Sequence, residues 1–357
     1  MRPQRTAAGV GCKSASRGPP DPRAKRRGRP AVIVGMPGLC RLPSRLLVPL
    51  FAITWGLPAL ANPVLSGADP DCAVFDGVYW LYPTGNVRGG GFKAYSSTDL
   101  RTWSDRGVIF SFKNAPWIAE DGRKGHGAWA PGILRSNDKF YLYYSVGPQD
   151  KDHPSRIGVA VADKPQGPFV DSGKALVIGG NGFEAIDAMA FADPKTGSVY
   201  LYAGGSAGAK LRVWELNDDR VTLKREIEVE SPKEFTEGAF MHERDGVYYL
   251  SYSHGGWNSP NYSVHYATAE APTGPWTYRG KILGSDATHK GPGHHSFVKN
   301  PKSGEWFIVY HRYETTSNNS PLKGQRRIAV DKVTYDADGA IKPVTMTDKP
   351  GPVSPIR

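Results

Sequence analysis

Five side chains able to bind or react with a ligand recur at similar positions along the chain. Each stands 9 to 12 residues ahead of an aromatic segment; the five are Asp69, Trp129, Asp187, Glu237 and His294. Three of them are carboxylic acids, which can donate or accept protons in general acid–base catalysis. The regular placement predicts that one structural unit presents a functional side chain five times.

The aromatic segments are themselves repeats. They read VYWLY from Val78, FYLYY from Phe140, VYLYA from Val199, VYYLSY from Val247 and WFIVYH from Trp306. Their starts are separated by 62, 59, 48 and 59 residues, and most follow turn sequences such as NDK, KTGS, RDG or KSGE. Aromatic strands joined by such turns at this period indicate repeated β-units.

The repeats predict an all-β protein, a five-bladed β-propeller in a single domain. A β-solenoid is the alternative, but its repeats are shorter. The first strand of each propeller blade lines the central channel, so the five recurring positions would meet at one mouth. Three carboxylates gathered there would repel one another, and burial would raise at least one pKa. In the alternative interpretation, each acid only caps a turn.

The N-terminal part of the chain predicts export. Residues 36–61 carry two arginines, an apolar run and then Ala59-Leu60-Ala61, which is typical of a signal peptide and its cleavage site. A membrane anchor or a buried helix is the alternative, although two prolines interrupt the run, which is short for a span. Residues 1–35 are expected to be a non-structured extension, and 62–357 the propeller, secreted or periplasmic.

Charge and cysteine content exclude several classes of function. Residues 1–61 hold eleven Lys/Arg and one acid, so +10 of the formal charge of +11 lies there and +1 remains. Nucleic-acid binding through net charge is therefore not expected, and no membrane contact is predicted beyond the signal peptide. Cys72 alone remains after Ala61, which excludes an intramolecular disulfide and a four-cysteine metal site in that part.

Six motifs, in order, resemble those of glycoside hydrolase family 43. They are ADPD, SSTDLRTW, WAP, AIDAMAF, TEGAF and GPGHHSF, and the resemblance runs from about Asn62 to the C-terminus. It implies a five-bladed propeller that acts on arabinose- or xylose-containing polysaccharides. It also implies inversion of configuration, with Asp69 as general base, Glu237 as general acid and Asp187 raising the pKa of that acid. Asp71, on the same strand face, is the rival for the base.

The resemblance also bears on metal binding. It implies that His294 lies at the channel centre, where members of the family often hold Ca²⁺ with water as further ligands. A single histidine does not by itself argue for calcium, which prefers oxygen ligands, and a polar structural core is the alternative. No organic cofactor is expected. His295 is expected to orient a neighbour or the substrate.

Aromatic and basic residues complete the predicted site. Trp129 is expected to form the wall under the sugar ring, or alternatively to pack between blades. Phe240 is a further candidate for substrate contact, with Trp257 and Tyr262 as weaker ones. Among the basic residues of the last repeat, Arg326 is expected to bind sugar hydroxyls, while Arg312 and Arg327 are the alternatives.

The substrate is expected to be a plant cell-wall carbohydrate such as arabinan, arabinoxylan or an oligosaccharide derived from them. We expect an enzyme that removes terminal α-L-arabinofuranosyl residues. A β-D-xylosidase and an endo-arabinanase of the same mechanism are the alternatives, and a non-catalytic carbohydrate-binding propeller is a further one. The segments GGNGFEAID and HGGWNSPNYS are candidate loops for blocking an open groove.

Overall fold

The computed structural model describes residues 62–85, 87, 89–349 and 353–356. The predicted extension, signal peptide and cleavage site lie outside the described residues. Within this part of the chain, no helix is both long and apolar enough to span a membrane. The helical elements described are two 3₁₀ turns, η1 (Phe112–Asn114) and η2 (Pro116–Asp121).

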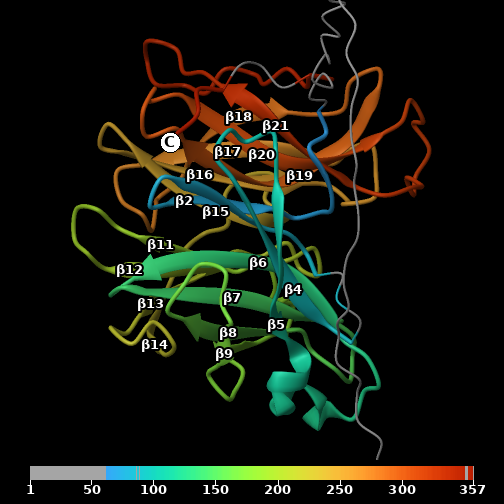
Figure 1. Ribbon diagram of the computed structural model, residues 1–357, viewed down its shortest axis with the longest axis vertical. Coiled ribbons are helices and arrows are strands. Elements are labelled where there is room, and N and C mark those ends of the chain that lie inside the picture. The colour runs from blue at the N-terminus through green and yellow to red at the C-terminus, as the bar shows by residue number, and fades with distance from the viewer. Residues whose placement is uncertain (1–61, 86, 88, 350–352, 357) are drawn as a thin grey trace, which may run out of the picture. The chain divides into compact units, whose positions relative to one another are not determined.

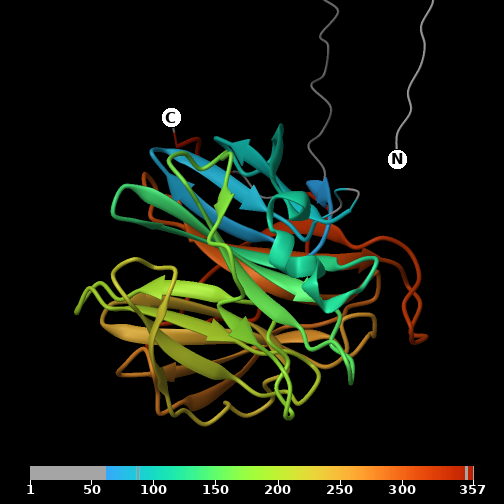
Figure 2. The same ribbon diagram turned by 90° about the horizontal axis from the view of Figure 1, so that it is seen from below.

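Five antiparallel sheets form a five-bladed propeller, which confirms the predicted fold class and excludes the solenoid (Figures 1 and 2). Blade one contains β2 (Asp71–Phe75), β3 (Val78–Tyr82), β4 (Gly91–Ser97) and β5 (Ser104–Ser111). Blade two contains β6 (Gly127–Ser136), β7 (Lys139–Gly147), β8 (Arg156–Ala162) and β10 (Val177–Ile178), with β9 (Val170–Asp171) also paired to β8.

The remaining blades follow the same strand order. Blade three contains β11 (Met189–Ala192), β12 (Val199–Ala203), β13 (Arg212–Leu216) and β14 (Leu223–Ile227). Blade four contains β15 (Glu237–Arg244), β16 (Val247–His254), β17 (Ser263–Ala269) and β18 (Thr277–Leu283). Blade five contains β19 (His289–Lys299), β20 (Trp306–Glu314), β21 (Arg327–Val333) and β1 (Leu65–Ser66). Each aromatic repeat is thus the second strand of a blade.

The fifth blade is closed by residues from the start of the described chain. Strand β1 pairs with β21, with Leu65 opposite Ile328 and Ser66 opposite Arg327. The buried Asn62 side chain accepts from the Val330 N–H at 3.0 Å and donates to the Val330 carbonyl at 3.1 Å. Joining both ends of the described chain in one sheet completes the ring without an exposed edge on β21.

The apolar core is divided into five clusters, one between each pair of neighbouring blades. Strand β7 shows how the aromatic repeats build them. Tyr141 and Tyr143 pack against blade three, whereas Phe140, Leu142 and Tyr144 pack against blade one. Because both faces of the second strand are buried, every position there favours a large apolar or aromatic side chain. This explains the aromatic repeats of the sequence.

A left-handed backbone residue, termed the strand head, lies shortly before or within the first strand of each blade. The φ angles are positive at Asp69 (50°), Ala130 (37°), Asp187 (59°), Gly238 (62°) and His294 (39°), one residue in each blade. The register of β6, β15 and β19 shifts next to these residues. Such irregularities turn a side chain away from the alternating pattern of the strand, and non-glycine residues adopt this conformation at a cost.

Side chains of the preceding blade stabilise four of these five heads. In each case the backbone N–H of the left-handed residue donates a hydrogen bond to a residue in or just after the preceding blade's second strand. The pairs are Asp69 with His311 Nδ1 (3.2 Å), Ala130 with Thr84 Oγ1 (2.9 Å), Asp187 with Ser145 Oγ (2.9 Å) and His294 with Ser253 Oγ (2.8 Å). The second strand of one blade therefore positions the functional residue of the next.

Removing one of these acceptors should destabilise the fold. Ser145 is fully buried, so Ser145→Ala leaves the Asp187 N–H without its partner and should lower the free energy of unfolding by about 1–3 kcal/mol. Chemical denaturation of both proteins measures the difference. Ser104→Ala, at an exposed position, serves as the control, and equal stability of Ser145→Ala and the parent would contradict the anchoring role.

Candidate active site

A cavity of about 260 Å³ brings together all five residues predicted from the repeats. Its other lining residues come from loops and strand ends of the third, fourth and fifth blades. The complete lining is Asp69, Trp129, Glu184, Ile186, Asp187, Ser206, Glu237, Trp257, His294 and Arg326. The convergence expected from a propeller is therefore observed, and Arg326 lies in the same cavity.

Asp69 is held by charged and polar partners. Its Oδ1 lies 2.7 Å from Arg326 Nη1, and its Oδ2 accepts a hydrogen bond from Thr84 Oγ1 at 2.6 Å. Burial by itself would raise the pKa of this carboxyl, but Arg326 and His294, with a smaller contribution from His311, outweigh it. The pKa of Asp69 is held well below its usual range, so the carboxylate stays ionised and can accept a proton.

Glu237 has the opposite electrostatic environment. Burial, followed by the nearby negative charge of Asp187, raises its pKa to about 8. Tyr262 donates a hydrogen bond to Glu237 Oε1 at 2.7 Å, which opposes this rise but does not cancel it. Because no Lys, Arg or His of the described chain forms an ion pair with Glu237, the neutral acid is favoured near pH 7.

His294 lies between two of the carboxylates. Its Nδ1 is 3.4 Å from Asp187 Oδ2 and 3.8 Å from Asp69 Oδ1. Burial would lower the pKa of His294, but Asp187 and Asp69 raise it to about 9. The protonated imidazole therefore supplies a positive charge that both carboxylates share, which reduces their mutual repulsion.

Trp129 lies in the wall of the cavity. Gly147, its neighbour on β7, leaves room for the indole, because a Cβ at Gly147 would lie 2.0 Å from the Trp129 ring. A flat indole face in this position can cover the apolar C–H face of a sugar ring.

Two predicted substrate residues lie elsewhere, and these assignments are corrected. His295 is buried beside the channel, where its Nε2 lies 2.7 Å from Ser251 Oγ and its ring contacts Phe297. Phe240 lines a second cavity, of about 410 Å³, formed by later residues of the same first strands. Successive side chains on a strand point to opposite sides, and the bulges in these strands change which side each residue faces. A residue close in sequence to a site residue therefore need not line the same cavity.

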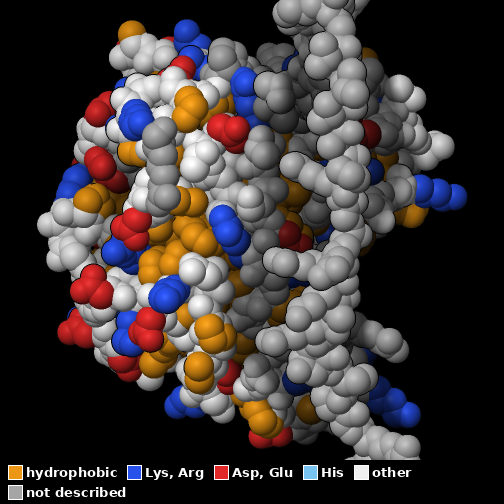
Figure 3. Space-filling model, viewed as in Figure 1, with side chains coloured by type: hydrophobic (Ala, Val, Ile, Leu, Met, Phe, Trp, Pro, Cys, Tyr) orange, Lys and Arg blue, Asp and Glu red, His pale blue; other side chains and the backbone are white. Residues whose placement is uncertain are grey.

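Asp71, the rival for the base, also lies outside the carboxylate cavity. Its Oδ2 accepts the Ile133 N–H at 2.6 Å, and the side chain lines the second cavity instead. Burial raises its pKa to about 6, with the Ile133 hydrogen bond opposing the rise. Figure 3 shows apolar side chains gathered over β2, β11 and β15, which contribute to this second cavity.

Of the four remaining candidates, two lie at the site and two lie outside it. Trp257 lines the carboxylate cavity, and its ring lies 4.8 Å from the Arg326 guanidinium. Tyr262 contacts Glu237 as described above. Arg312 is fully buried and bonds Glu314 and Tyr310, while Arg327 is exposed. Neither of these two arginines lines the cavity.

Sequence reasoning missed five contributors to the site: Thr84, Glu184, Ile186, Ser206 and His311. Thr84 and His311 lie 6 and 5 residues after the starts of their aromatic repeats, Val78 and Trp306. Comparing the ends of the repeats as well as their starts could have found both. Glu184 and Ile186 lie in the segment between β10 and β11, and Ser206 lies in the loop between β12 and β13, where the repeat offers no signal.

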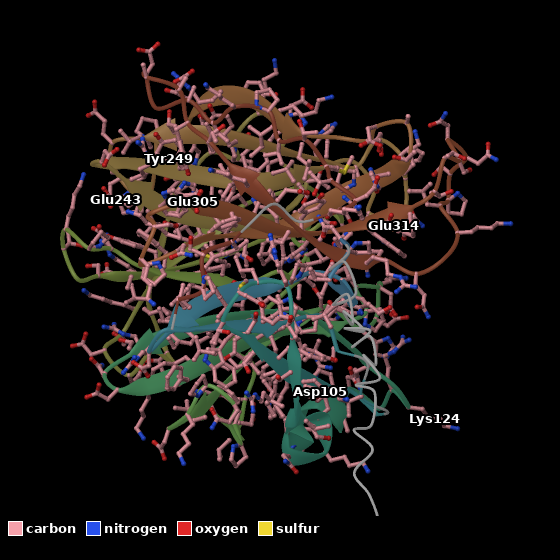
Figure 4. All side chains as sticks on the ribbon, turned by 45° about the horizontal axis from the view of Figure 1, so that its top comes forward. Asp105, Lys124, Glu243, Tyr249, Glu305 and Glu314 are labelled. Atoms are coloured by element: carbon pink, nitrogen blue, oxygen red, sulfur yellow. The ribbon has the colours of Figure 1, made fainter. Side chains whose placement is uncertain are left out.

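The surroundings of His294 do not form a direct calcium cage. Its two carboxylate neighbours are engaged in ion pairs through Nδ1, and calcium needs six to eight oxygen ligands. Calcium held largely through water at the channel centre stays a prediction. Within the described residues, one group could hold a metal: His289, Glu314 and Asp348. Glu314 is the last residue of β20 and lies far from Glu305, which immediately precedes the strand (Figure 4).

Comparison with known proteins identifies the family. The family model "Glycosyl hydrolases family 43" matches residues 60–341. The chain belongs to this family. It is 36% identical over 318 residues to a β-D-galactofuranosidase of Aspergillus niger, covering 84% of this chain and 88% of that protein. It is 30% identical to a xylosidase/arabinosidase of Humicola insolens, covering 79% and 97%.

Solved structures agree with the family assignment. A thermostable family-43 glycoside hydrolase has a TM-score of 0.69 and 30% identity, covering 82% of this chain and 99% of that one. A β-xylosidase/α-arabinofuranosidase from a compost microbial metagenome has a TM-score of 0.63 and 28% identity, covering 78% and 94%. Its structure is described as a complex with xylotriose in a calcium-free form. The protein is therefore a glycoside hydrolase.

The pKa of Glu237 should depend on Asp187. Asp187→Asn removes a negative charge that favours the neutral acid, so the pKa of Glu237 should fall by about one unit from its value of about 8. The basic limb of the kcat/KM profile should move to lower pH by the same amount. Asp163→Asn, at an exposed position, is the control. A basic limb that stays in place in Asp187→Asn would contradict this coupling.

Proposed function

We propose that this glycoside hydrolase is a secreted, inverting enzyme that removes terminal α-L-arabinofuranosyl residues from plant cell-wall polysaccharides or oligosaccharides. The observation that carries the proposal is the division of charge in one small cavity. Asp69 is held ionised by Arg326, whereas Glu237 has no cationic partner among the described residues and is favoured as the neutral acid. A glycosidase needs these two states at once.

The proposed reaction uses these two groups on opposite sides of the sugar. Asp69 accepts a proton from a water molecule as the water oxygen attacks the anomeric carbon. The glycosidic bond breaks, and Glu237 gives its proton to the leaving oxygen. Inverting enzymes hold such carboxyl groups roughly 6.5–9.5 Å apart to admit the water. Asp69 precedes the first strand of blade one, Glu237 begins that of blade four, and both line the same cavity, which suits this arrangement.

Asp187 and His294 support the two reacting groups. The charge of Asp187 raises the pKa of Glu237, and His294 lies within 4 Å of carboxylate oxygens of both Asp187 and Asp69. Trp129 provides an apolar face, and Arg326 both keeps Asp69 ionised and offers donors to sugar hydroxyls. Export and a water-coordinated calcium near His294 form part of the proposal as well.

The size of the cavity favours removal of a terminal sugar. Its volume of about 260 Å³ is below the roughly 300–1,000 Å³ typical of sites for drug-sized ligands, which suits a single sugar unit. Trp257 and Arg326 form part of its wall on the sides of the fourth and fifth blades. An endo-arabinanase, as one 27% identical relative from Bacillus subtilis is named, would need an open groove for a chain that continues in both directions.

The names of two relatives support two alternative substrates. The Humicola insolens relative is named for both xylosidase and arabinosidase activity, so β-D-xylosides are the first alternative. The Aspergillus niger relative is named a β-D-galactofuranosidase, and its 36% identity makes a galactofuranoside the second. A β-D-galactofuranosyl ring has the ring configuration of α-L-arabinofuranose and a longer exocyclic arm, so one pocket could accept both.

A substrate panel tests the proposed function. We expect the highest kcat/KM on 4-nitrophenyl α-L-arabinofuranoside, lower values on the β-D-xylopyranoside and β-D-galactofuranoside, and release of arabinose from arabinan ends. NMR of the first product formed should show the inverted anomer. Arabino-oligosaccharides released from within linear arabinan would favour the endo-enzyme, and a higher kcat/KM on another glycoside would replace the proposed substrate.

The leaving group separates the roles of the two carboxyls. Glu237→Ala should lose activity strongly, by about 10²–10⁴-fold, on natural linkages, whose alkoxide leaving groups need a proton. It should lose much less on aryl glycosides with good leaving groups. Asp69→Ala should lose activity on both, because no leaving group replaces the base. Equal losses on both substrate types in Glu237→Ala would overturn its assignment as the proton donor.

A further inference from the structure

The catalytic cavity contains a fourth carboxylate that the reaction does not use. Glu184 lies three residues before Asp187, lines the cavity and is 8% exposed. Among the described residues, no Lys, Arg or His forms an ion pair with it. Burial raises its pKa, as does Asp187, while the hydrogen bond from Ala207 lowers it. A buried carboxyl without a cation is costly unless a ligand provides a partner.

One oxygen of Glu184 is held and the other is open. Oε2 accepts the Ala207 N–H at 2.7 Å and lies 3.4 Å from Ser206 Oγ. Gly205 permits this approach, because a Cβ there would lie 2.5 Å from Oε2. Oε1 has no hydrogen-bond partner among the described residues. The loop of the third blade therefore fixes the carboxyl and leaves one acceptor for a hydroxyl in the cavity.

The position of Glu184 in the ring of blades indicates which part of the sugar it faces. Asp69 belongs to blade one and is bonded to Arg326, which stands just before β21 of blade five. Glu184 lies in the segment that joins β10 of blade two to β11 of blade three, and its carboxyl is bonded to the loop between β12 and β13 of blade three, which neighbours neither blade one nor blade five. A sugar whose anomeric carbon lies beside Asp69 would present to this carboxyl a part of the ring away from that carbon. In a furanosyl ring, the exocyclic arm on C4 lies across the ring oxygen from that carbon.

We propose that Glu184 is a specificity-determining residue whose Oε1 accepts a hydrogen bond from a hydroxyl on the exocyclic arm of a terminal furanosyl ring, with Ser206 beside it. This inference rests on the proposed function, since it requires a furanoside in the cavity. A xylopyranosyl ring has no exocyclic arm and makes no such bond. Glu184 thereby favours arabinofuranosides and galactofuranosides over xylosides.

The test compares Glu184→Ala and Glu184→Gln with the parent on three 4-nitrophenyl glycosides: α-L-arabinofuranoside, β-D-galactofuranoside and β-D-xylopyranoside. Glu184→Ala should lose roughly 10- to 100-fold in kcat/KM on the furanosides, as for a hydrogen bond to a charged group. On the xyloside the loss should stay within about threefold. Glu184→Gln keeps an acceptor oxygen and should lose less on the furanosides.

Two controls separate recognition from structural damage. Glu228→Ala, an exposed carboxylate after β14, should behave as the parent, and the melting temperature of each variant reports folding. The basic limb of the pH profile should not move in Glu184→Gln, whereas a role exerted through Asp187 and Glu237 would shift it.

The outcomes distinguish this inference from the proposed function. If the parent enzyme cleaves the furanosides, three results would overturn the assignment of Glu184. They are equal losses of kcat/KM in Glu184→Ala on all three glycosides, no loss on any of them, and a shifted basic limb in Glu184→Gln. A parent enzyme that cleaves neither furanoside would instead overturn the proposed function, and this inference with it.

Discussion

The active site depends on a hydrogen bond that crosses from one blade to the next. A left-handed residue at the head of each first strand turns the functional side chains toward the channel, and this conformation is unfavourable for aspartate, alanine or histidine. In four blades, the backbone N–H of that residue donates a hydrogen bond to a side chain of the preceding blade. The catalytic geometry is therefore a property of the closed ring and not of any single blade.

This arrangement also brings several carboxyl groups together, and the surroundings of Asp69 and Glu237 shift their pKa values in opposite directions. Asp69 lies beside the positive charges of Arg326 and His294 and accepts a hydrogen bond from Thr84, so it stays ionised. Burial, followed by the negative charge of Asp187, raises the pKa of Glu237, so its proton is retained up to about pH 8 although the hydrogen bond from Tyr262 opposes the rise. Two carboxyls with the same intrinsic chemistry thus acquire opposite roles, because one has a cation beside it and the other has an anion.

Residues in or next to the same first strands line two different cavities. Their heads carry the charged residues of the catalytic cavity, whereas their later residues, including Phe240 and Phe297, line the apolar second cavity. The bulge between the two parts changes the side on which each residue points. A polar cavity and a largely apolar one can therefore be built from the same first strands.

The amino-acid sequence was sufficient to predict the fold class and the five recurring positions, because second strands that are buried on both faces leave an aromatic repeat that is visible along the chain. It also determined Asp69, Asp187 and Glu237 as candidates, since their spacing to those strands is nearly constant. The contacts in three dimensions show that Asp71, Phe240 and His295 lie outside the catalytic cavity. The left-handed residues Asp69 and His294 and the register shift after Glu237 change the side that a following residue faces without changing its spacing. Glu184 enters the cavity from a loop with no counterpart in the other repeats, and the pKa values depend on which charges meet across blades. Neither follows from spacing along the chain, since both arise from contacts between residues far apart in sequence.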